Sequence, residues 1–201
     1  MTLEQLRRRF AAAAPLAESI YGDEGMRPGA EALKPAAVLI PIVERPAGLS
    51  VLFTRRASHL RDHSGQVSFP GGRVAAADAS PEATALREAR EEIGLAPDRV
   101  ELLGRLPEYH TRTGFRIAPV VGLLLPPFEL HADANEVEEI FEVPLAFLLD
   151  PANHQRQSRE WQGEQRWFYA MPYQGHYIWG ATAGMLVNLS RHLAQGPDPA
   201  R

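Results

Sequence analysis

The sequence predicts an α/β fold of the α+β kind, in which a mixed β-sheet lies between helices that cover both of its faces. Two observations lead to this prediction. Strand-like apolar runs outnumber helical patterns, and the helical patterns fall in the middle and at the end of the chain. A chain of 201 residues, 45% hydrophobic and 23% charged, is long enough to bury a substantial core in one domain.

The composition excludes several classes of function. The chain contains no cysteine, so disulfides, thiolate catalysis and cysteine-ligated zinc are ruled out. A net charge of -4 argues against nonspecific binding to nucleic acid or to an anionic membrane. No apolar run has the length of a membrane span, and the first residues lack the apolar core of a signal peptide. We therefore expect a cytoplasmic protein without nucleic-acid or membrane partners.

The N-terminal segment shows a helical spacing of apolar residues at Leu3, Leu6 and Phe10. We expect residues 1–35 to form a helical extension packed on the main domain. The main domain then covers residues 36–195, and residues 196–201 form a disordered tail. The amphipathic segment could instead contribute to a homodimer interface.

The first half of the predicted sheet comes from short apolar segments. Residues 36–43 form a compact apolar run that suits a buried strand, and residues 49–56 follow a Pro-Ala-Gly turn as the second arm of a hairpin. Residues 68–72 (SFPGG) interrupt regular structure, because proline and paired glycine favour turns. Residues 99–106 and 116–125 are predicted to be further strands.

The second half adds strands and a closing helix. Residues 136–150 are predicted to form a strand that turns at Pro144 into a short helix. Residues 166–173 and 176–180 are predicted to form a late hairpin. The apolar stripe within residues 181–196 indicates the closing helix.

The central helix has clear start and stop signals. Ser80 offers a capping hydroxyl, Pro81 suits the first helical position, and Gly94 can adopt the left-handed conformation that often ends a helix. Its predicted packed face consists of Leu86, Ala89 and Ile93.

Three glutamates crowd the end of this helix: Glu88, Glu91 and Glu92. Their spacing places them along one edge of the helix. Negative charge is unfavourable in the last turns, by roughly 0.3–1 kcal/mol per group, although Arg87 can pair with Glu91. A solvated helix face is one interpretation. The other is a nest of hard oxygen ligands for Mg²⁺ or Mn²⁺.

The segment GGRVAAADASPEATALREAREEIGL resembles the box of the Nudix hydrolase family, G-x5-E-x7-R-E-U-x-E-E-x-G-U, where U is aliphatic. The matching residues are Gly72, Arg87, Glu88, Glu91, Glu92, Gly94 and Leu95. The first half of the box departs from the pattern. Asp78 replaces the first glutamate, one extra residue separates it from Arg87, and Ala89 is small for an aliphatic position.

The segment just upstream, LFTRRASHLRDHSGQVSFPGG, resembles the signature of the coenzyme A pyrophosphatase branch of the family, L-L-T-x-R-[SA]-x3-R-x3-G-x3-F-P-G-G. Phe53 replaces the second leucine. The resemblance implies the Nudix fold and hydrolysis of coenzyme A to 3',5'-ADP and 4'-phosphopantetheine. It also implies Mg²⁺ or Mn²⁺ bound by Glu88, Glu91, Glu92 and the carbonyl of Gly71. The ions would neutralise the diphosphate and orient a water molecule.

The resemblance leaves the general base open. Glu91 could be a metal ligand or the group that deprotonates the water, and Arg87 is expected to hold a glutamate in place. The segment around residues 135–144 offers Glu136, Glu138 and Glu139 as further bases. We favour Glu139, and strand alternation predicts that Glu138 lies on the opposite face.

Four arginines are candidate ligands for substrate phosphates, because the guanidinium fork pairs with phosphate at two points. They are Arg55, Arg56, Arg61 and Arg112. Strand alternation separates the adjacent pair, so at most one of those two should face the site.

Other residues have weaker functional interpretations. The spacing of His59, His63 and His110 matches no zinc motif, so hydrogen-bonded histidines are expected. Three tryptophans could stack on adenine, but we expect packing in the core or at its rim for each of them. They are Trp161, Trp167 and Trp179.

Two alternative functions stay open at this stage. One is a Nudix pyrophosphatase for ADP-ribose, NADH or another nucleoside diphosphate derivative. The other is a Nudix module that binds a nucleotide without catalysis.

Overall fold

The computed structural model describes residues 1–14, 16, 33–60, 63–161 and 163–195. Three sequence predictions concern other parts of the chain, wholly or in part. The tail at 196–201, the phosphate-binding role of Arg61 and most of the second half of the extension predicted for residues 1–35 lie outside the described residues.

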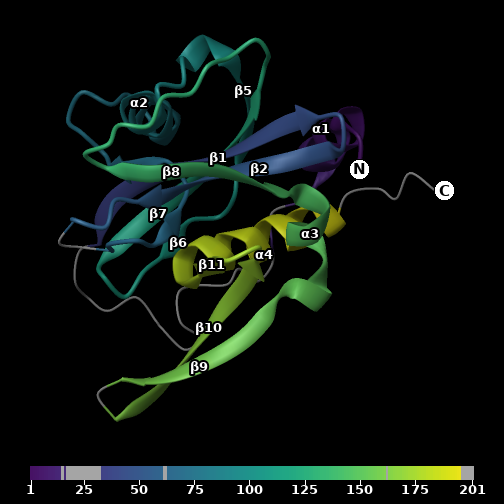
Figure 1. The fold of residues 1–201 in the computed structure, drawn as a ribbon. Coiled ribbons are helices and arrows are strands. Elements are labelled where there is room, and N and C mark those ends of the chain that lie inside the picture. The colour runs from purple at the N-terminus through teal and green to yellow at the C-terminus, as the bar shows by residue number, and fades with distance from the viewer. Residues whose placement is uncertain (15, 17–32, 61–62, 162, 196–201) are drawn as a thin grey trace.

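The described elements follow one another in a strand-rich order with helices at the start, middle and end (Figure 1). They are α1 (Leu3–Ala12), β1 (Lys34–Arg45), β2 (Gly48–Arg56), β3 (Val67–Ser68), β4 (Gly71–Arg73), α2 (Pro81–Ile93), the 3-10 turn η1 (Pro97–Arg99), β5 (Val100–Arg105), β6 (Tyr109–His110), β7 (Phe115–Leu124), β8 (Val137–Pro144), α3 (Leu145–Leu149), the 3-10 turn η2 (Pro151–Asn153), β9 (Gln155–Trp161), β10 (Glu164–Tyr173), β11 (His176–Trp179) and α4 (Gly180–Ala194).

The main sheet is mixed. Its backbone order is β3-β2-β1-β7-β5, with β4 paired to β1, β6 to β7 and β8 to β2. Strands β1 and β7 run parallel, from Lys34 opposite Phe115 to Val43 opposite Leu124, whereas β1 and β2 form an antiparallel hairpin. The parallel pair requires the chain to cross over between them, and α2 lies within that crossover.

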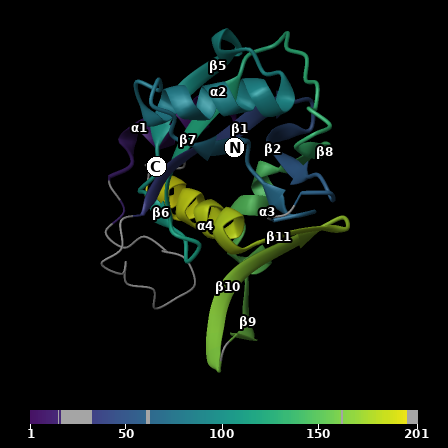
Figure 2. The ribbon, with the colours of Figure 1, turned by 90° about the vertical axis from the view of Figure 1, so that its left-hand side faces the viewer.

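Helices cover both faces of this sheet, as the sequence predicts (Figure 2). Leu39 and Leu52 point to one face, where they pack with Ala85, Ala89 and Ile93 of α2. The alternate residues of the same strands point to the other face and pack against α3, α4 and α1. The predicted fold class is therefore confirmed.

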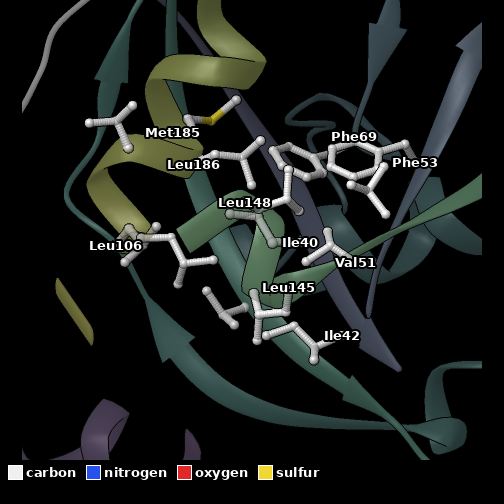
Figure 3. Close-up of a cluster of buried hydrophobic side chains, with 14 of the residues drawn as sticks. Ile40, Ile42, Val51, Phe53, Phe69, Leu106, Leu145, Leu148, Met185 and Leu186 are labelled. Atoms are coloured by element: carbon white, nitrogen blue, oxygen red, sulfur yellow. The ribbon is translucent and has the colours of Figure 1, made fainter. Parts of the chain in front are cut away.

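The larger core lies between the sheet and helices α3 and α4 (Figure 3). Ile40 and Ile42 from β1 meet Leu145 and Leu148 from α3, and Leu186 comes from α4. All five side chains are essentially inaccessible to water. Each such burial stabilises the fold by roughly 1.5–3 kcal/mol, so this core fixes the sheet that carries the site.

A separate three-stranded sheet, β11-β10-β9, projects from the body. The sequence predicts β10 and β11 but misses β9. The segment QRQSREW of β9 has no apolar alternation, because β9 pairs only with β10 and most of its described side chains are exposed. Strand β4 is a smaller correction, since Gly71–Arg73 pairs with β1 where an irregular break was expected.

Helix α2 begins and ends where its capping residues predict. Ser80 accepts a hydrogen bond from the Ala83 N–H, and Gly94 ends the helix with a φ of 68°. The predicted packed face is wrong at Leu86, which is only partly buried. Ala85 takes that place, because the small alanines let the helix axis approach the sheet closely.

Helix α1 packs on the main domain. The Phe10 ring lies 4.7 Å from the His192 ring of α4, and the Arg7 Nε donates to Glu101 of β5 at 2.8 Å. In the part of the chain that is described, no helix is both long and apolar enough to cross a bilayer.

Candidate active site

The end of α2 buries one carboxylate and half-buries another. Glu92 is only 4% exposed and accepts a hydrogen bond from the Gly71 N–H at 3.3 Å. The Glu88 side chain is 16% exposed, whereas that of Glu91 is 57% exposed. The three predicted ligands therefore share one helix edge but differ strongly in their contact with water.

Gly72 makes room for Glu88, and the sequence gives no site role to this glycine beyond its place in the box. A Cβ atom at this position would lie 2.5 Å from the Glu88 carboxyl carbon. The Glu88 carboxylate thus rests directly against the backbone of β4. Any side chain at residue 72 would displace it.

Arg87 ties the site together through its guanidinium. Its Nη1 lies 2.8 Å from Glu88 and 2.9 Å from Glu91. Its Nε and Nη2 each donate to one oxygen of Asp78 at 3.0 Å, and Nη2 also donates to the Arg73 carbonyl at 3.1 Å. Arg87 therefore contacts two box glutamates, an arrangement compatible with the expectation that it holds a glutamate in place.

Asp78 is the partner that orients Arg87. Its carboxylate also accepts hydrogen bonds from the Ala75 N–H and the Thr84 hydroxyl, both at 2.8 Å. The hydrogen bonds from Arg87, then that from Ala75, hold the pKa of Asp78 well below its usual range. The aspartate in place of the box's first glutamate thus works as an anchor despite the extra residue.

A fourth carboxylate, Glu136, reaches the same region from the loop before β8. The loop is fixed to the end of α2, because the Asp133 N–H donates to the Glu92 carbonyl at 2.9 Å. The Ala57 N–H in turn donates to the Glu136 carbonyl at 2.9 Å. The sequence offers Glu136 as one of three candidate bases. In the structure its negative charge acts on both Glu88 and Glu92.

The clustering of carboxylates shifts their proton affinities. Burial, followed by the negative charges of Glu136 and Glu88, raises the pKa of Glu92 to about 8. The Gly71 N–H and the positive charge of Arg56 act in the opposite direction. Burial also raises the pKa of Glu88, against the pull of Arg87. The raised pKa means that Glu92 holds its proton near neutral pH when no cation is bound.

This chemistry fits a divalent cation. Carboxylate oxygens from Glu88, Glu92 and Glu136 are the hard ligands that Mg²⁺ and Mn²⁺ prefer, and a cation bound there would stabilise the ionised forms of these groups. Within the described residues no three acidic or histidine side chains already stand in the geometry of a metal cage. Glu88 is instead turned toward Arg87, and metal binding would require it to release that guanidinium.

A cavity of about 520 Å³ opens beside the carboxylates, on the α4 side of the sheet. Gly71 and Arg56 belong both to its lining and to the surroundings of Glu92. None of the described lining residues is acidic, and three of them are arginines: Arg56, Arg73 and Arg112. The Arg56 Nε is buried and has no hydrogen-bond partner among the described residues. The cavity is thus suited to an anionic ligand.

The four predicted phosphate ligands separate in the structure. Arg56 and Arg112 line the cavity, whereas Arg61 is not described. Arg55 faces away from it, and its Nη2 lies 3.1 Å from Glu139 and 3.4 Å from Glu138. Of the two adjacent arginines, only Arg56 is among the described residues that line the cavity, as the alternation of side chains along a strand predicts.

Glu139 and Glu138 were expected on opposite faces, and both carboxylates contact the Arg55 guanidinium. A β-bulge between Arg55 and Arg56 shifts the register with β8 at this point. Glu139, the favoured base, also contacts His176 at 3.2 Å. The structure does not bring it to the box glutamates.

The predicted hydrogen-bonded state of the histidines is found for two of them. His59 contacts the Asn135 carbonyl at 3.1 Å, and His63 contacts the Gln66 side chain at 2.8 Å. His110 lies 4.0 Å from Glu108. The three rings have separate partners, so no zinc site is indicated among the described residues.

Comparisons with known proteins agree with this geometry. The family model described as the NUDIX domain matches residues 33–170. The chain belongs to the Nudix family. It is 42% identical over 162 residues to an uncharacterized Nudix hydrolase named NudL from Enterobacter sp. strain 638, which covers 81% of this chain and 84% of the relative. NudL from Escherichia coli K12 strain DH10B is 41% identical over the same shares.

The Nudix fold is also found in solved structures. The crystal structure of RenU, a Nudix hydrolase from M. smegmatis, covers 92% of this chain and all of its own, with a TM-score of 0.56 and 19% identity. This likeness shows the fold alone. As a Nudix hydrolase, the protein is an enzyme of a family that binds small nucleotide substrates and generally uses divalent metal ions.

The role of Arg87 can be tested by replacing it with lysine, which keeps the charge but loses the planar fork. We expect Arg87→Lys to lower the free energy of unfolding by about 1 kcal/mol, a modest value because the guanidinium is partly in water. The matched control is Arg90→Lys, an exposed position on the same helix, and it should be neutral. Equal losses in urea denaturation of both variants would contradict this role.

The raised pKa of Glu92 predicts how stability depends on pH without metal. The folded protein keeps this proton up to about pH 8, whereas an unfolded glutamate loses it near 4.5. Unfolding therefore releases a proton between these values, so the free energy of unfolding should fall as pH rises through them. Glu92→Gln removes this titration. Denaturation at pH 5 to 8 in a chelator should give a flatter profile for the variant, and parallel profiles would refute the assignment.

Proposed function

We propose that this Nudix hydrolase cleaves the diphosphate of coenzyme A, and of its acyl derivatives, to 3',5'-ADP and 4'-phosphopantetheine. One observation carries the proposal. The segment that resembles the coenzyme A branch, residues 52–72, supplies a large part of the cavity wall beside the carboxylates. Its described lining residues are Arg56, His63, Gln66, Val67, Ser68, Phe69 and Gly71.

The charge of the cavity supports the same substrate. Coenzyme A carries a diphosphate and a further phosphate, and the lining offers three guanidinium groups without a competing carboxylate. Arg56 stands at the end nearest Glu92, where the diphosphate would lie, and Arg112 stands on the turn before β7. The thiol end of coenzyme A is far from the bond that breaks, which is why acyl derivatives fit the same chemistry.

The reaction adds one water molecule to a phosphorus of the diphosphate. The new P–O bond replaces the bridging P–O bond, so each product leaves with a phosphate monoester. A divalent cation, Mg²⁺ or Mn²⁺, would neutralise the diphosphate at this site. We assign Glu88, Glu92 and the Gly71 carbonyl to hold that ion, and Glu91 to ligation or to accepting the proton of the water.

Glu136 is our preferred additional base, in place of Glu139. Its loop is fixed by backbone hydrogen bonds to α2 and to Ala57, and its charge acts on both Glu88 and Glu92. Glu139 is occupied by Arg55 and His176. Arg87 acts indirectly in this scheme, because it orients Glu88 and Glu91 and releases them when the cation binds.

The substrate can be tested with coenzyme A, ADP-ribose and NADH side by side, in Mg²⁺ and in Mn²⁺. We expect the highest kcat/KM for coenzyme A, with 3',5'-ADP as the nucleotide product on chromatography. A higher kcat/KM for ADP-ribose or NADH would overturn the assignment of coenzyme A as the substrate and favour another nucleoside diphosphate derivative. Absence of hydrolysis of all three would favour a module that binds nucleotides without catalysis.

The acidic cluster can be tested with Glu136→Gln and a neighbouring control, Glu138→Gln, whose carboxylate faces Arg55. Removing the Glu136 charge should lower kcat by about 10²-fold or more if it serves as base, whereas the control should stay near wild type. Isothermal titration with Mn²⁺ separates the two roles of Glu136. Unchanged kcat and unchanged Mn²⁺ affinity in Glu136→Gln would remove it from the site.

A further inference from the structure

The cavity lining also includes an aromatic ring and a guanidinium that are not part of the carboxylate cluster. The ring is Trp179, the residue before α4, and the guanidinium belongs to Arg112 in the turn between β6 and β7. Neither residue belongs to the box or to the upstream signature.

Trp179 is held in a fixed position. It pairs with Ala170 across the projecting sheet, and Gly180 follows with a φ of 62°, a left-handed conformation that lets the strand pass directly into α4. The Phe168 ring packs edge-on against the indole at 5.4 Å. The buried Thr182 hydroxyl donates to the Val67 carbonyl at 3.1 Å, which fixes the start of α4 against β3.

Arg112 is presented by a closely hydrogen-bonded turn. The Thr111 N–H donates to the Phe115 carbonyl at 2.8 Å, the Phe115 N–H donates to the Thr111 hydroxyl at 3.1 Å, and the Gly114 N–H donates to the Thr111 carbonyl at 3.1 Å. The Arg112 Nη2 lies 3.6 Å from Glu164, an exposed residue at the start of β10. An exposed contact at this distance is weak.

We propose that Trp179 and Arg112 form the subsite for the nucleotide end of the substrate. The adenine ring stacks on the Trp179 indole, and the Arg112 guanidinium binds the phosphate on the ribose. A flat ring and a guanidinium in the lining of one cavity suit a nucleoside phosphate, because every base offers a π face and phosphate accepts two bonds from one guanidinium. The inference rests on the proposed function, since it takes the diphosphate to lie beside Glu92.

Trp167 provides the matched control for Trp179. It lies on β10 of the same projecting sheet, and the Arg156 guanidinium covers its ring at 4.6 Å. Trp167 is absent from the cavity lining among the described residues. Substitution of either tryptophan removes one indole from the same sheet, but only one of the two substitutions changes the cavity.

The test is direct binding of adenosine 3',5'-bisphosphate to the full chain in a chelator, measured by tryptophan fluorescence and by calorimetry. We expect quenching in wild type and in Trp167→Phe, and none in Trp179→Phe. Trp179→Leu should weaken binding by about fivefold or more, the loss of one stacked base. Circular dichroism and thermal melting of Trp179→Phe confirm that the sheet is retained. Unchanged quenching and affinity in the Trp179 variants would overturn the subsite.

Arg112→Gln tests the phosphate contact. Its affinity for adenosine 3',5'-bisphosphate should fall by about tenfold, while its affinity for 5'-AMP should stay near wild type. Equal losses for both ligands would refute the assignment of Arg112. Hydrolysis of coenzyme A by wild type is measured separately. Binding that depends on Trp179 without hydrolysis would overturn the proposed function and keep the subsite. Hydrolysis of coenzyme A together with nucleotide binding that does not depend on Trp179 would keep the proposed function and overturn the subsite.

Discussion

The site depends on one costly interaction, the burial of the Glu92 carboxylate beside two other carboxylates. Ionising a buried carboxyl group without compensation is strongly unfavourable, so Glu92 keeps its proton near neutral pH unless a positive charge stabilises the ionised form. On one side of Glu92, β4 brings the Gly71 N–H to its carboxyl group. The loop that carries Glu136 adds negative charge from the other side, fixed by its backbone bond to Glu92. A cation bound at this cluster would stabilise the ionised form of Glu92.

Arg87 gives the cluster part of that compensation within the protein itself. Its guanidinium contacts Glu88 and Glu91 while Asp78 holds it from behind with two hydrogen bonds. A cation at Glu88 and Glu92 would compete with Arg87 for the same carboxylate. Because Asp78 limits how far the guanidinium can follow, Glu88 can turn toward a cation without dragging the arginine into the site. Asp78 would therefore keep Arg87 in place if Glu88 left its ion pair with Arg87 to bind a cation.

The helix that carries these groups was predictable because its signals are local. Ser80, Pro81 and Gly94 define its ends, and the spacing of the glutamates defines their shared edge. Glu136 could not be chosen over Glu139 from sequence. The choice depends on a bulge between Arg55 and Arg56 that changes which side chains face each other across two strands. Strand β9 was missed for a similar reason, since a strand exposed on both faces shows no apolar period.

The two halves of the site belong to different cores of the molecule. Helix α2 and the carboxylates lie over one face of the sheet, while the cavity lies over the other face with α4. They meet at Gly71 and Arg56, where β4 and the end of β2 come together. Residues on the α4 side can therefore change without disturbing the ligands on α2. If the cavity holds the nucleotide end as we propose, substrate choice would depend on the cavity wall, including Trp179, and hydrolysis on the carboxylates of α2.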